Sequence, residues 1–136
     1  VRLVGSEMCI RDRTDMAWHT ITEPFEGDVE QFEVASMAPT QVLPVVPGTA
    51  MAPAFGHIFS GGYAAGYYGY KWAEVLEADA FSLFKEKGIF NREVSGSFRE
   101  NILSKGGTEH PMELYVRFRG HKPETRALIE KMGLGK

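Results

Sequence analysis

The sequence has few of the features that mark secreted, nucleic-acid-binding or membrane-spanning proteins. Its single cysteine, Cys9, cannot form an intrachain disulfide, which excludes a disulfide scaffold and favours a reducing compartment. The net charge of −3 comes without a basic stripe, so a nucleic-acid surface is not expected. No apolar run approaches the roughly 18 residues of a membrane span. These absences together predict a cytoplasmic protein without nucleic-acid or membrane partners.

Common catalytic motifs are absent as well. The sequence contains no H-E-x-x-H, no CxxC pair, no G-x-S-x-G and no Walker loop. A Ser60-Gly61-Gly62 break precedes a helical pattern, and a helix N-terminus can bind an anion. Two glycines without longer spacing are weak evidence for a phosphate site. We therefore interpret the break as a hinge, because glycine tolerates the φ values that a mobile loop visits.

The first residues differ from the rest of the chain. VRLVGSEMCIRDR, residues 1–13, has no amphipathic period and lacks the basic n-region and long h-region of a signal peptide. It resembles a translated adapter sequence, and the chain begins without methionine. We therefore expect residues 1–13 to be non-native read-through sequence and residues 14–136 to be one helical segment of a larger domain.

Helical patterns with local start and stop signals follow, and no convincing strand does. Asp28 and Asn91 are good N-cap residues, and Gly88 is well placed just after a helix. Residues 41–53 contain too many prolines for a regular element. The predicted helices, five or six in number, cover residues 15–21, 28–38, 62–87, 92–104, 109–119 and 123–132. The prediction is an all-α fold.

Three tyrosines give the long predicted helix its functional interest. If that helix begins at Gly62, Tyr63, Tyr67 and Tyr70 fall at i, i+4 and i+7 and share one face. Each glycine inside a helix lowers the helix stability by roughly 1 kcal/mol relative to alanine. We expect the close approach of another chain or a ligand to offset that loss. Packing of the rings under neighbouring elements is the alternative. The expected buried face carries Trp72, Val75, Leu76, Ala80 and Leu83.

Phenols and one histidine could serve a reaction in which an oxygen gains negative charge. A phenol with a pKa near 10 stays a neutral hydrogen-bond donor at physiological pH, and such a donor suits an oxyanion. His57 reaches the same face from the preceding loop. His19 is more simply a structural residue than a metal ligand.

The same stretch carries a family resemblance. GHIFSGGYAAGYYGYKWAEVLEADAFSLF resembles the C-terminal region of the zinc metallopeptidases of the thimet oligopeptidase family, nearest to the bacterial peptidyl-dipeptidase and oligopeptidase A branch. The resemblance begins at DMAWHT and continues to the terminal MGL, about residues 15–136. Its most specific feature is the spacing His-x5-Tyr-x6-Tyr within GGYAAGYY.

The resemblance implies a zincin-like, nearly all-helical peptidase of two lobes with one zinc ion on the floor of a channel. In this family an H-E-x-x-H helix and a later glutamate hold the zinc. By motif position His57 and Tyr63 are the catalytic donors to the oxyanion, and Tyr70 positions the substrate backbone. The further substrate-binding positions are Gly61, Gly62 and Tyr67.

Helical spacing also predicts how far apart the tyrosines lie along a bound peptide. Tyr63 and Tyr70 would lie about 10 Å apart along the helix, enough to span two or three residues of an extended peptide. Glu74 would follow one turn later, facing substrate or a basic residue of the other lobe. The remaining polar candidates are expected at a wet surface or a lobe contact: Lys105, His110, Arg117, Arg119 and His121.

We therefore expect the C-terminal substrate-binding part of a zinc-dependent oligopeptidase, in particular a peptidyl-dipeptidase that releases C-terminal dipeptides from short peptides. An oligopeptidase A-like endopeptidase and a non-catalytic helical module that binds a peptide or partner remain open. No metal ligand is expected within residues 14–136. The chain alone should thus neither retain zinc nor cleave peptides without the missing N-terminal part.

Overall fold

The structure is a computed structural model that describes residues 2–134 and the side chains of residues 9–134. The described residues form helices and turns without a strand, which confirms the all-α prediction. The chain divides into two compact units, Val1–Lys71 and Trp72–Lys136, called here the N-terminal and C-terminal units. Within the described part, no helix has both the length and the apolar character needed to cross a membrane.

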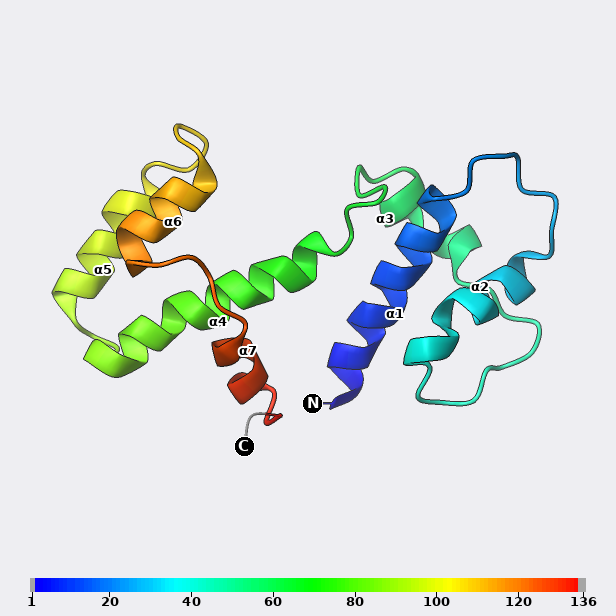
Figure 1. Cartoon of the computed structure of the whole chain (residues 1–136), viewed down its shortest axis with the longest axis horizontal. Coiled ribbons are helices and arrows are strands. Elements are labelled where there is room, and N and C mark those ends of the chain that lie inside the picture. Colours follow the sequence, from blue (N-terminus) through cyan, green and yellow to red (C-terminus); the bar gives the residue numbers. More distant parts are fainter. Residues whose placement is uncertain (1, 135–136) are drawn as a thin grey trace. The chain divides into compact units, whose positions relative to one another are not determined.

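The N-terminal unit packs α1 against α2 (Figure 1). Helix α1 extends the helix predicted at residues 15–21 toward the N-terminus, so that residues 2–13 are helical as well. That residues 1–13 are non-native sequence stays a prediction. The elements of the unit are α1 (Arg2–His19), α2 (Val29–Met37), the 3₁₀ turns η1 (Ala38–Thr40) and η2 (Ala52–Ala54), α3 (Gly56–Phe59) and the first residues of α4 (Gly69–Lys87).

Aromatic packing holds these short elements together. The Trp18 ring lies 5.0 Å from the Phe25 ring and 4.4 Å from the Phe32 ring, joining α1 to α2 and to the connection before it. Trp18 also packs against the buried cluster of Phe55, Ile58 and Tyr67. This small core positions α3 and the turn that follows it.

Residues 41–53 were predicted to form no regular element, which holds for residues 41–51, whereas residues 52 and 53 belong to the 3₁₀ turn η2. A side chain of α2 holds the end of this segment. The buried Glu33 carboxylate of α2 accepts the Met51 N–H at 2.6 Å and the Ala52 N–H. Glu30, one turn earlier, accepts the Gly48 N–H at 2.8 Å. The predicted N-cap is confirmed, since Asp28 accepts the Gln31 N–H at 2.9 Å.

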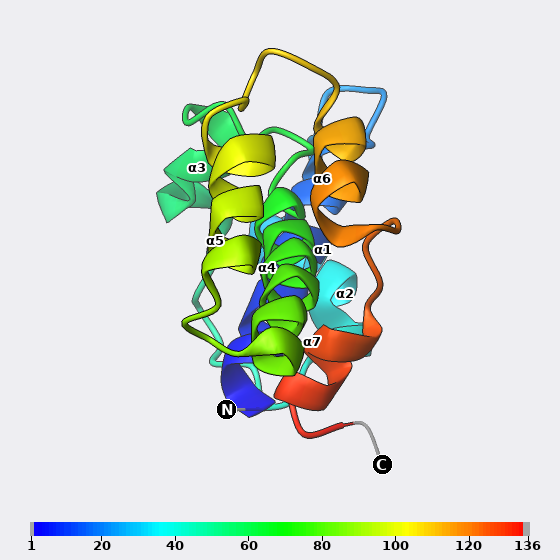
Figure 2. The ribbon, with the colours of Figure 1, turned by 90° about the vertical axis from the view of Figure 1, so that its left-hand side faces the viewer.

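In the C-terminal unit α5 and α6 flank α4 (Figure 2). Ala80, Val94, Tyr115 and Phe118 form its main core, to which α4, α5 and α6 all contribute. Trp72 was predicted on this buried face and is 44% exposed, because packing starts one turn later, at Val75. The remaining elements are α5 (Arg92–Phe98), the π-helical turn η3 (Arg99–Leu103), α6 (Pro111–Arg119) and α7 (Arg126–Lys131).

Most predicted helix ends in this unit are confirmed. Asn91 accepts the N–H groups of Glu93 and Val94, and α4 ends before Gly88. The last helix begins at Arg126 and not at Pro123. Residues 122–124 form no regular element, and the Lys122 carbonyl lies 2.6 Å from a His121 ring nitrogen.

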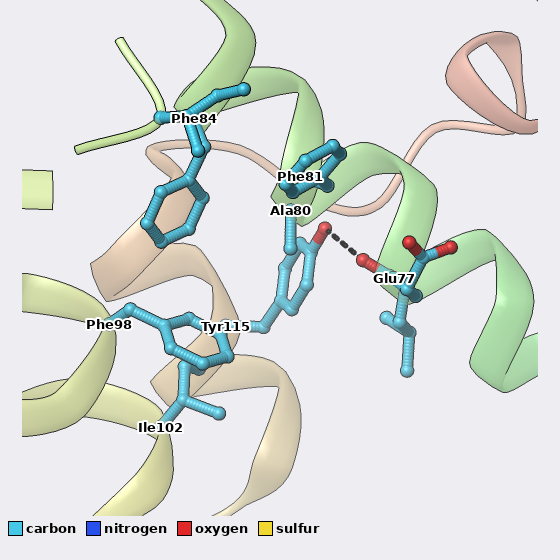
Figure 3. Close-up of a pocket in the computed structure, with 9 residues that line it drawn as sticks. Glu77, Ala80, Phe81, Phe84, Phe98, Ile102 and Tyr115 are labelled. Atoms are coloured by element: carbon cyan, nitrogen blue, oxygen red, sulfur yellow. Dashed lines mark hydrogen bonds between the residues drawn. The ribbon is translucent and has the colours of Figure 1, made fainter. Parts of the chain in front are cut away.

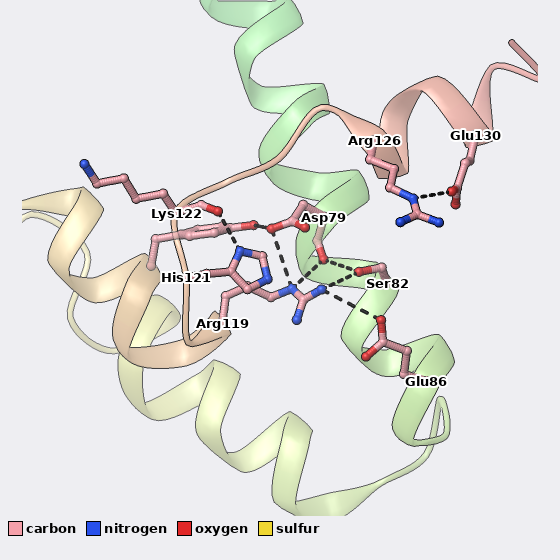
Figure 4. A network of polar contacts seen from close by, with 9 residues as sticks. Asp79, Ser82, Glu86, Arg119, His121, Lys122, Arg126 and Glu130 are labelled. Atoms are coloured by element: carbon pink, nitrogen blue, oxygen red, sulfur yellow. Dashed lines mark hydrogen bonds and ion pairs between the residues drawn. The ribbon is translucent and has the colours of Figure 1, made fainter. Parts of the chain in front are cut away.

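The expectation that Arg119 lies at a wet surface is wrong. Its side chain is mostly buried and donates to the Asp79 carbonyl at 3.1 Å and to the Ser82 hydroxyl at 2.9 Å (Figure 4). The buried Asp79 carboxylate also accepts the Tyr115 hydroxyl at 2.6 Å. A mostly buried polar network thus joins α4 to α6.

Lys105 and Arg117 do lie at the surface, where both contact Glu109. Hydrogen bonds from Arg117 and then Lys105 hold the pKa of the Glu109 carboxyl at about 2.

Candidate active-site turn

The long helix starts at Gly69, so the prediction that it starts at Gly62 is wrong. Residues 64–68 form consecutive turns, in which the Gly66 N–H donates to the Tyr63 carbonyl at 2.9 Å and the Gly69 N–H to the Gly66 carbonyl at 3.0 Å. Ala65 has φ +52°, a left-handed conformation that interrupts a right-handed helix. The three tyrosines therefore do not share a helical face.

Their rings are nevertheless gathered, together with His57. The Tyr63 and Tyr70 rings stack with centroids 5.2 Å apart and an interplanar angle of 27°. The His57 ring lies 6.2 Å from the Tyr63 ring. Tyr63 is 38% exposed and Tyr70 39%, and His57 is exposed too. The expected 10 Å separation along a helix is wrong, because the turn brings both phenols to one place.

Tyr67 lies in the core and not in the exposed group. It is 7% exposed, and its ring packs 5.0 Å from the Phe55 ring and 5.1 Å from the Tyr70 ring. The structure thus shows Tyr67 supporting Tyr70, and direct contact with a substrate stays a prediction for this residue.

The two glycines shape the turn for different reasons. A Cβ at Gly61 would lie 2.9 Å from the His57 Cα and 3.0 Å from the His57 carbonyl oxygen, so only glycine lets the chain fold back so closely. Gly62 has φ +81°, which other residues adopt only under strain. The Tyr63 N–H then donates to the His57 carbonyl at 3.2 Å. His57 and Tyr63 are thereby joined through the backbone.

A buried carboxylate on α1 holds the far side of the turn. Asp15 is fully buried and accepts the Ala65 N–H at 2.9 Å and the Tyr67 N–H at 2.8 Å. Glu33 holds residues 51 and 52 in the same way, so the intervening stretch with His57 is fixed at both ends. Neither carboxylate could be identified from the sequence, because an acidic residue in a helix usually faces water. The one available signal is that Asp15 shares a helix face with Trp18.

The two exposed phenols affect each other electrostatically. A side-chain hydrogen bond with Tyr63, followed by partial desolvation, raises the pKa of Tyr70 above its ordinary value of 10.0. Tyr70 is already protonated at physiological pH with its ordinary pKa, and the shift extends that state to higher pH. The group therefore offers hydroxyl donors and one imidazole.

The described residues provide no donor set for zinc. Nowhere in the described part of the chain do three His, Cys, Asp or Glu side chains converge as metal ligands would. Structural zinc sites need four such ligands and catalytic sites three.

A separate apolar pocket of about 560 Å³ lies in the C-terminal unit (Figure 3). Its polar groups are already engaged, since Tyr115 donates to Asp79 and Glu77 pairs with Lys131 at 2.6 Å. The pocket therefore has no free group for chemistry. Its labelled lining residues are Glu77, Ala80, Phe81, Phe84, Phe98, Ile102 and Tyr115.

Comparison with known proteins identifies the family to which this all-α chain belongs. Residues 6–134 match Peptidase family M3, a family of metallopeptidases, and the chain belongs to this family. The match confirms the family resemblance seen in the sequence.

Three curated relatives make the similarity specific. Oligopeptidase A of Escherichia coli (strain K12) is 63% identical over 81 residues, covering 60% of this chain and 12% of the relative. Probable cytosolic oligopeptidase A of Arabidopsis thaliana is 48% identical over 99 residues, 70% of this chain and 14% of the relative. Dipeptidyl carboxypeptidase of Escherichia coli (strain K12) is 40% identical over 131 residues, 95% of this chain and 19% of the relative. The chain thus spans less than a fifth of the length of these relatives.

Proposed function

We propose that this chain forms the substrate-facing side of the active site in a zinc-dependent family M3 peptidase that hydrolyses short peptides in the cytoplasm. The observation that carries the proposal is the exposed group of His57, Tyr63 and Tyr70 on a turn that buried carboxylates hold at both ends. Family membership supports a peptidase. The zinc ion and its ligands are proposed to come from the part of the protein outside this chain.

The exposed group suits the electronic change that peptide hydrolysis requires. When water attacks the scissile carbonyl, its oxygen gains negative charge, and donors already in place stabilise that charge. The Tyr63 ring contacts both the His57 ring and the Tyr70 ring, so we assign Tyr63 as the main donor to the oxyanion. His57 is the second donor. Tyr70, hydrogen-bonded to Tyr63, orients that donor and contacts the substrate backbone.

Two cleavage modes have support from the comparisons. Release of C-terminal dipeptides, the mode predicted from the sequence, is supported by the 131-residue similarity to dipeptidyl carboxypeptidase. Endopeptidase cleavage is supported by the higher identity, 63%, to oligopeptidase A. The same donors serve both modes, because each mode passes through a tetrahedral oxyanion.

Two graft proteins test the proposal. In each, this chain replaces the matching segment of Escherichia coli dipeptidyl carboxypeptidase or oligopeptidase A, and hydrolysis of an N-blocked decapeptide is followed by mass spectrometry. We expect chelator-sensitive turnover in both grafts. Inactive but folded and zinc-loaded grafts would contradict the proposal. C-terminal dipeptides from both grafts would assign dipeptide release to this chain, and internal cuts in both would assign endopeptidase cleavage.

A further inference from the structure

We propose that Asp15 is a positioning residue for the candidate active-site turn, holding Ala65 in its left-handed conformation so that Tyr63 and Tyr70 meet. The inference rests on the proposed function of that turn. Asp15 lies on α1, about 50 positions from the turn in sequence, and touches none of the exposed site side chains in the described contacts. Its effect on a reaction would therefore pass through the backbone of the turn.

The contacts of Asp15 all point to the turn or to its own helix. Oδ1 accepts the Ala65 N–H at 2.9 Å, and Oδ2 accepts the Tyr67 N–H at 2.8 Å. The His19 Nδ1 lies 2.9 Å from Oδ1 and 2.8 Å from the Asp15 carbonyl oxygen. Both of these oxygens are acceptors, so Nδ1 carries the hydrogen and donates to them. The carboxylate is fully buried, with three donors arranged around it.

The turn needs such an anchor because alanine rarely adopts a positive φ. Ala65 is the one non-glycine residue with positive φ in the described part of the chain. Such a conformation persists where the surroundings enforce it, and it is often found where function requires a fixed geometry. Asp15 binds the N–H of Ala65 itself and that of Tyr67, whose buried ring supports Tyr70.

The first part of the test measures geometry by amide NMR of the dipeptidyl carboxypeptidase graft, labelled with ¹⁵N at alanine and tyrosine. Asp15→Asn keeps the shape of the side chain but removes its charge and turns one acceptor into a donor. We expect the Ala65 and Tyr67 amide protons to move upfield and to exchange at least about tenfold faster, as in a locally opened segment. The matched control is Asp28→Asn, because asparagine caps a helix as well as aspartate does.

The second part measures kinetics in the dipeptidyl carboxypeptidase graft. A displacement of the oxyanion donor by a fraction of an ångström to 1 Å should lower kcat about tenfold to a hundredfold. KM should stay within about twofold, because the donor acts mainly in the transition state. A purely structural role would lower the melting temperature without this selective loss of kcat.

A rescue experiment separates positioning from general stability. Glycine adopts a positive φ without the penalty that alanine incurs. Adding Ala65→Gly to Asp15→Asn should therefore recover about fivefold of the lost kcat, the factor that corresponds to one left-handed alanine. No recovery, or an unchanged kcat in folded Asp15→Asn, would overturn the proposal.

Two further variants keep the outcomes distinct. If Asp15→Asn does not fold, His19→Phe removes one donor from the carboxylate and should still shift the Ala65 and Tyr67 amides; unchanged amides would count against the inference. Tyr63→Phe removes the proposed donor itself. A loss of kcat in Tyr63→Phe without one in Asp15→Asn refutes only the positioning role, whereas no loss in Tyr63→Phe refutes the proposed function.

Discussion

Single residues determine the shape of the candidate active-site turn, and its two glycines do so in ways that can be measured separately. Gly61 leaves room for the backbone of His57, whereas Gly62 supplies a positive φ. The sequence correctly indicated a break at these positions. It could not show which constraint applies to which glycine, because the close approach at Gly61 depends on how residues 57–63 fold back.

We expect Gly61→Ala to lower the free energy of unfolding by about 1–3 kcal/mol, because the added methyl group presses on backbone atoms that cannot rotate away. Gly62→Ala should cost about 1–2 kcal/mol through its positive φ. Urea unfolding followed by circular dichroism measures both. The control is Gly96→Ala in α5, where no atom lies within 4 Å of the new methyl, and a small gain in stability is expected. Equal effects at all three positions would contradict this account.

At the scale of secondary-structure elements, the helix starts that depend on neighbouring residues were predicted correctly, and the start that depends on a residue distant in the sequence was not. Helices α2 and α5 start where Asp28 and Asn91 cap them, because capping involves only neighbouring residues. The start of α4 was missed because the turn before it is held by Asp15, which is distant in the sequence. The candidate site could therefore be predicted as a set of residues, while the stacking of Tyr63 on Tyr70 could not.

The segment before the site depends on α2 through Glu33. We expect Glu33→Gln to lower the free energy of unfolding by about 1–3 kcal/mol, because an amide in that buried position leaves one N–H without an acceptor. Glu30→Gln, one turn earlier on the same helix, makes an exposed contact and should cost at most about 0.5 kcal/mol. Chemical denaturation of the two variants compares them directly. Equal costs would show that the buried contact does not anchor the segment.

The stability that the polar network between α4 and α6 contributes should fall at alkaline pH. Burial, followed by the hydrogen bond to Asp79, raises the pKa of Tyr115 well above its ordinary value of 10.0. The folded state therefore holds this proton more tightly than the unfolded state does. The resulting stability is present below pH 10 and is lost as the pH rises beyond it.

Tyr115→Phe tests the contribution of that polar network. It should lower the free energy of unfolding by about 1.5–3 kcal/mol at pH 7, because a hydrogen bond to a charged group is lost. It should also flatten the fall in stability between pH 9 and about pH 11 relative to the unmodified chain. Thermal melts across this range give both quantities. A fall of the same steepness in the variant would rule out Tyr115 as the titrating group.

At the scale of the whole molecule, the chain carries one side of a proposed active site and considerable uncovered apolar surface. Phe90 is almost fully exposed, and the apolar pocket is open in the C-terminal unit. Surfaces of this kind usually contact another protein segment. We expect the isolated chain to self-associate, as measured by light scattering after size-exclusion chromatography. A monodisperse monomer over the whole concentration range would contradict this expectation.

The isolated chain should also lack peptidase activity. Its described residues offer no metal ligand set, so zinc added to the purified chain should not be retained through dialysis. Incubation with zinc and a fluorogenic oligopeptide should give no turnover above the blank. Turnover that a chelator abolishes would show that the chain holds a complete active site.

The most direct test of the central claim compares two neighbouring tyrosines in the dipeptidyl carboxypeptidase graft. Tyr63→Phe removes the hydroxyl assigned to the oxyanion, and Tyr68→Phe removes an exposed hydroxyl with no assigned role. The account predicts that kcat falls about 10²–10³-fold in Tyr63→Phe, equivalent to roughly 2.7–4 kcal/mol, and stays within about twofold in Tyr68→Phe. Equal kcat values for the two folded variants would contradict it.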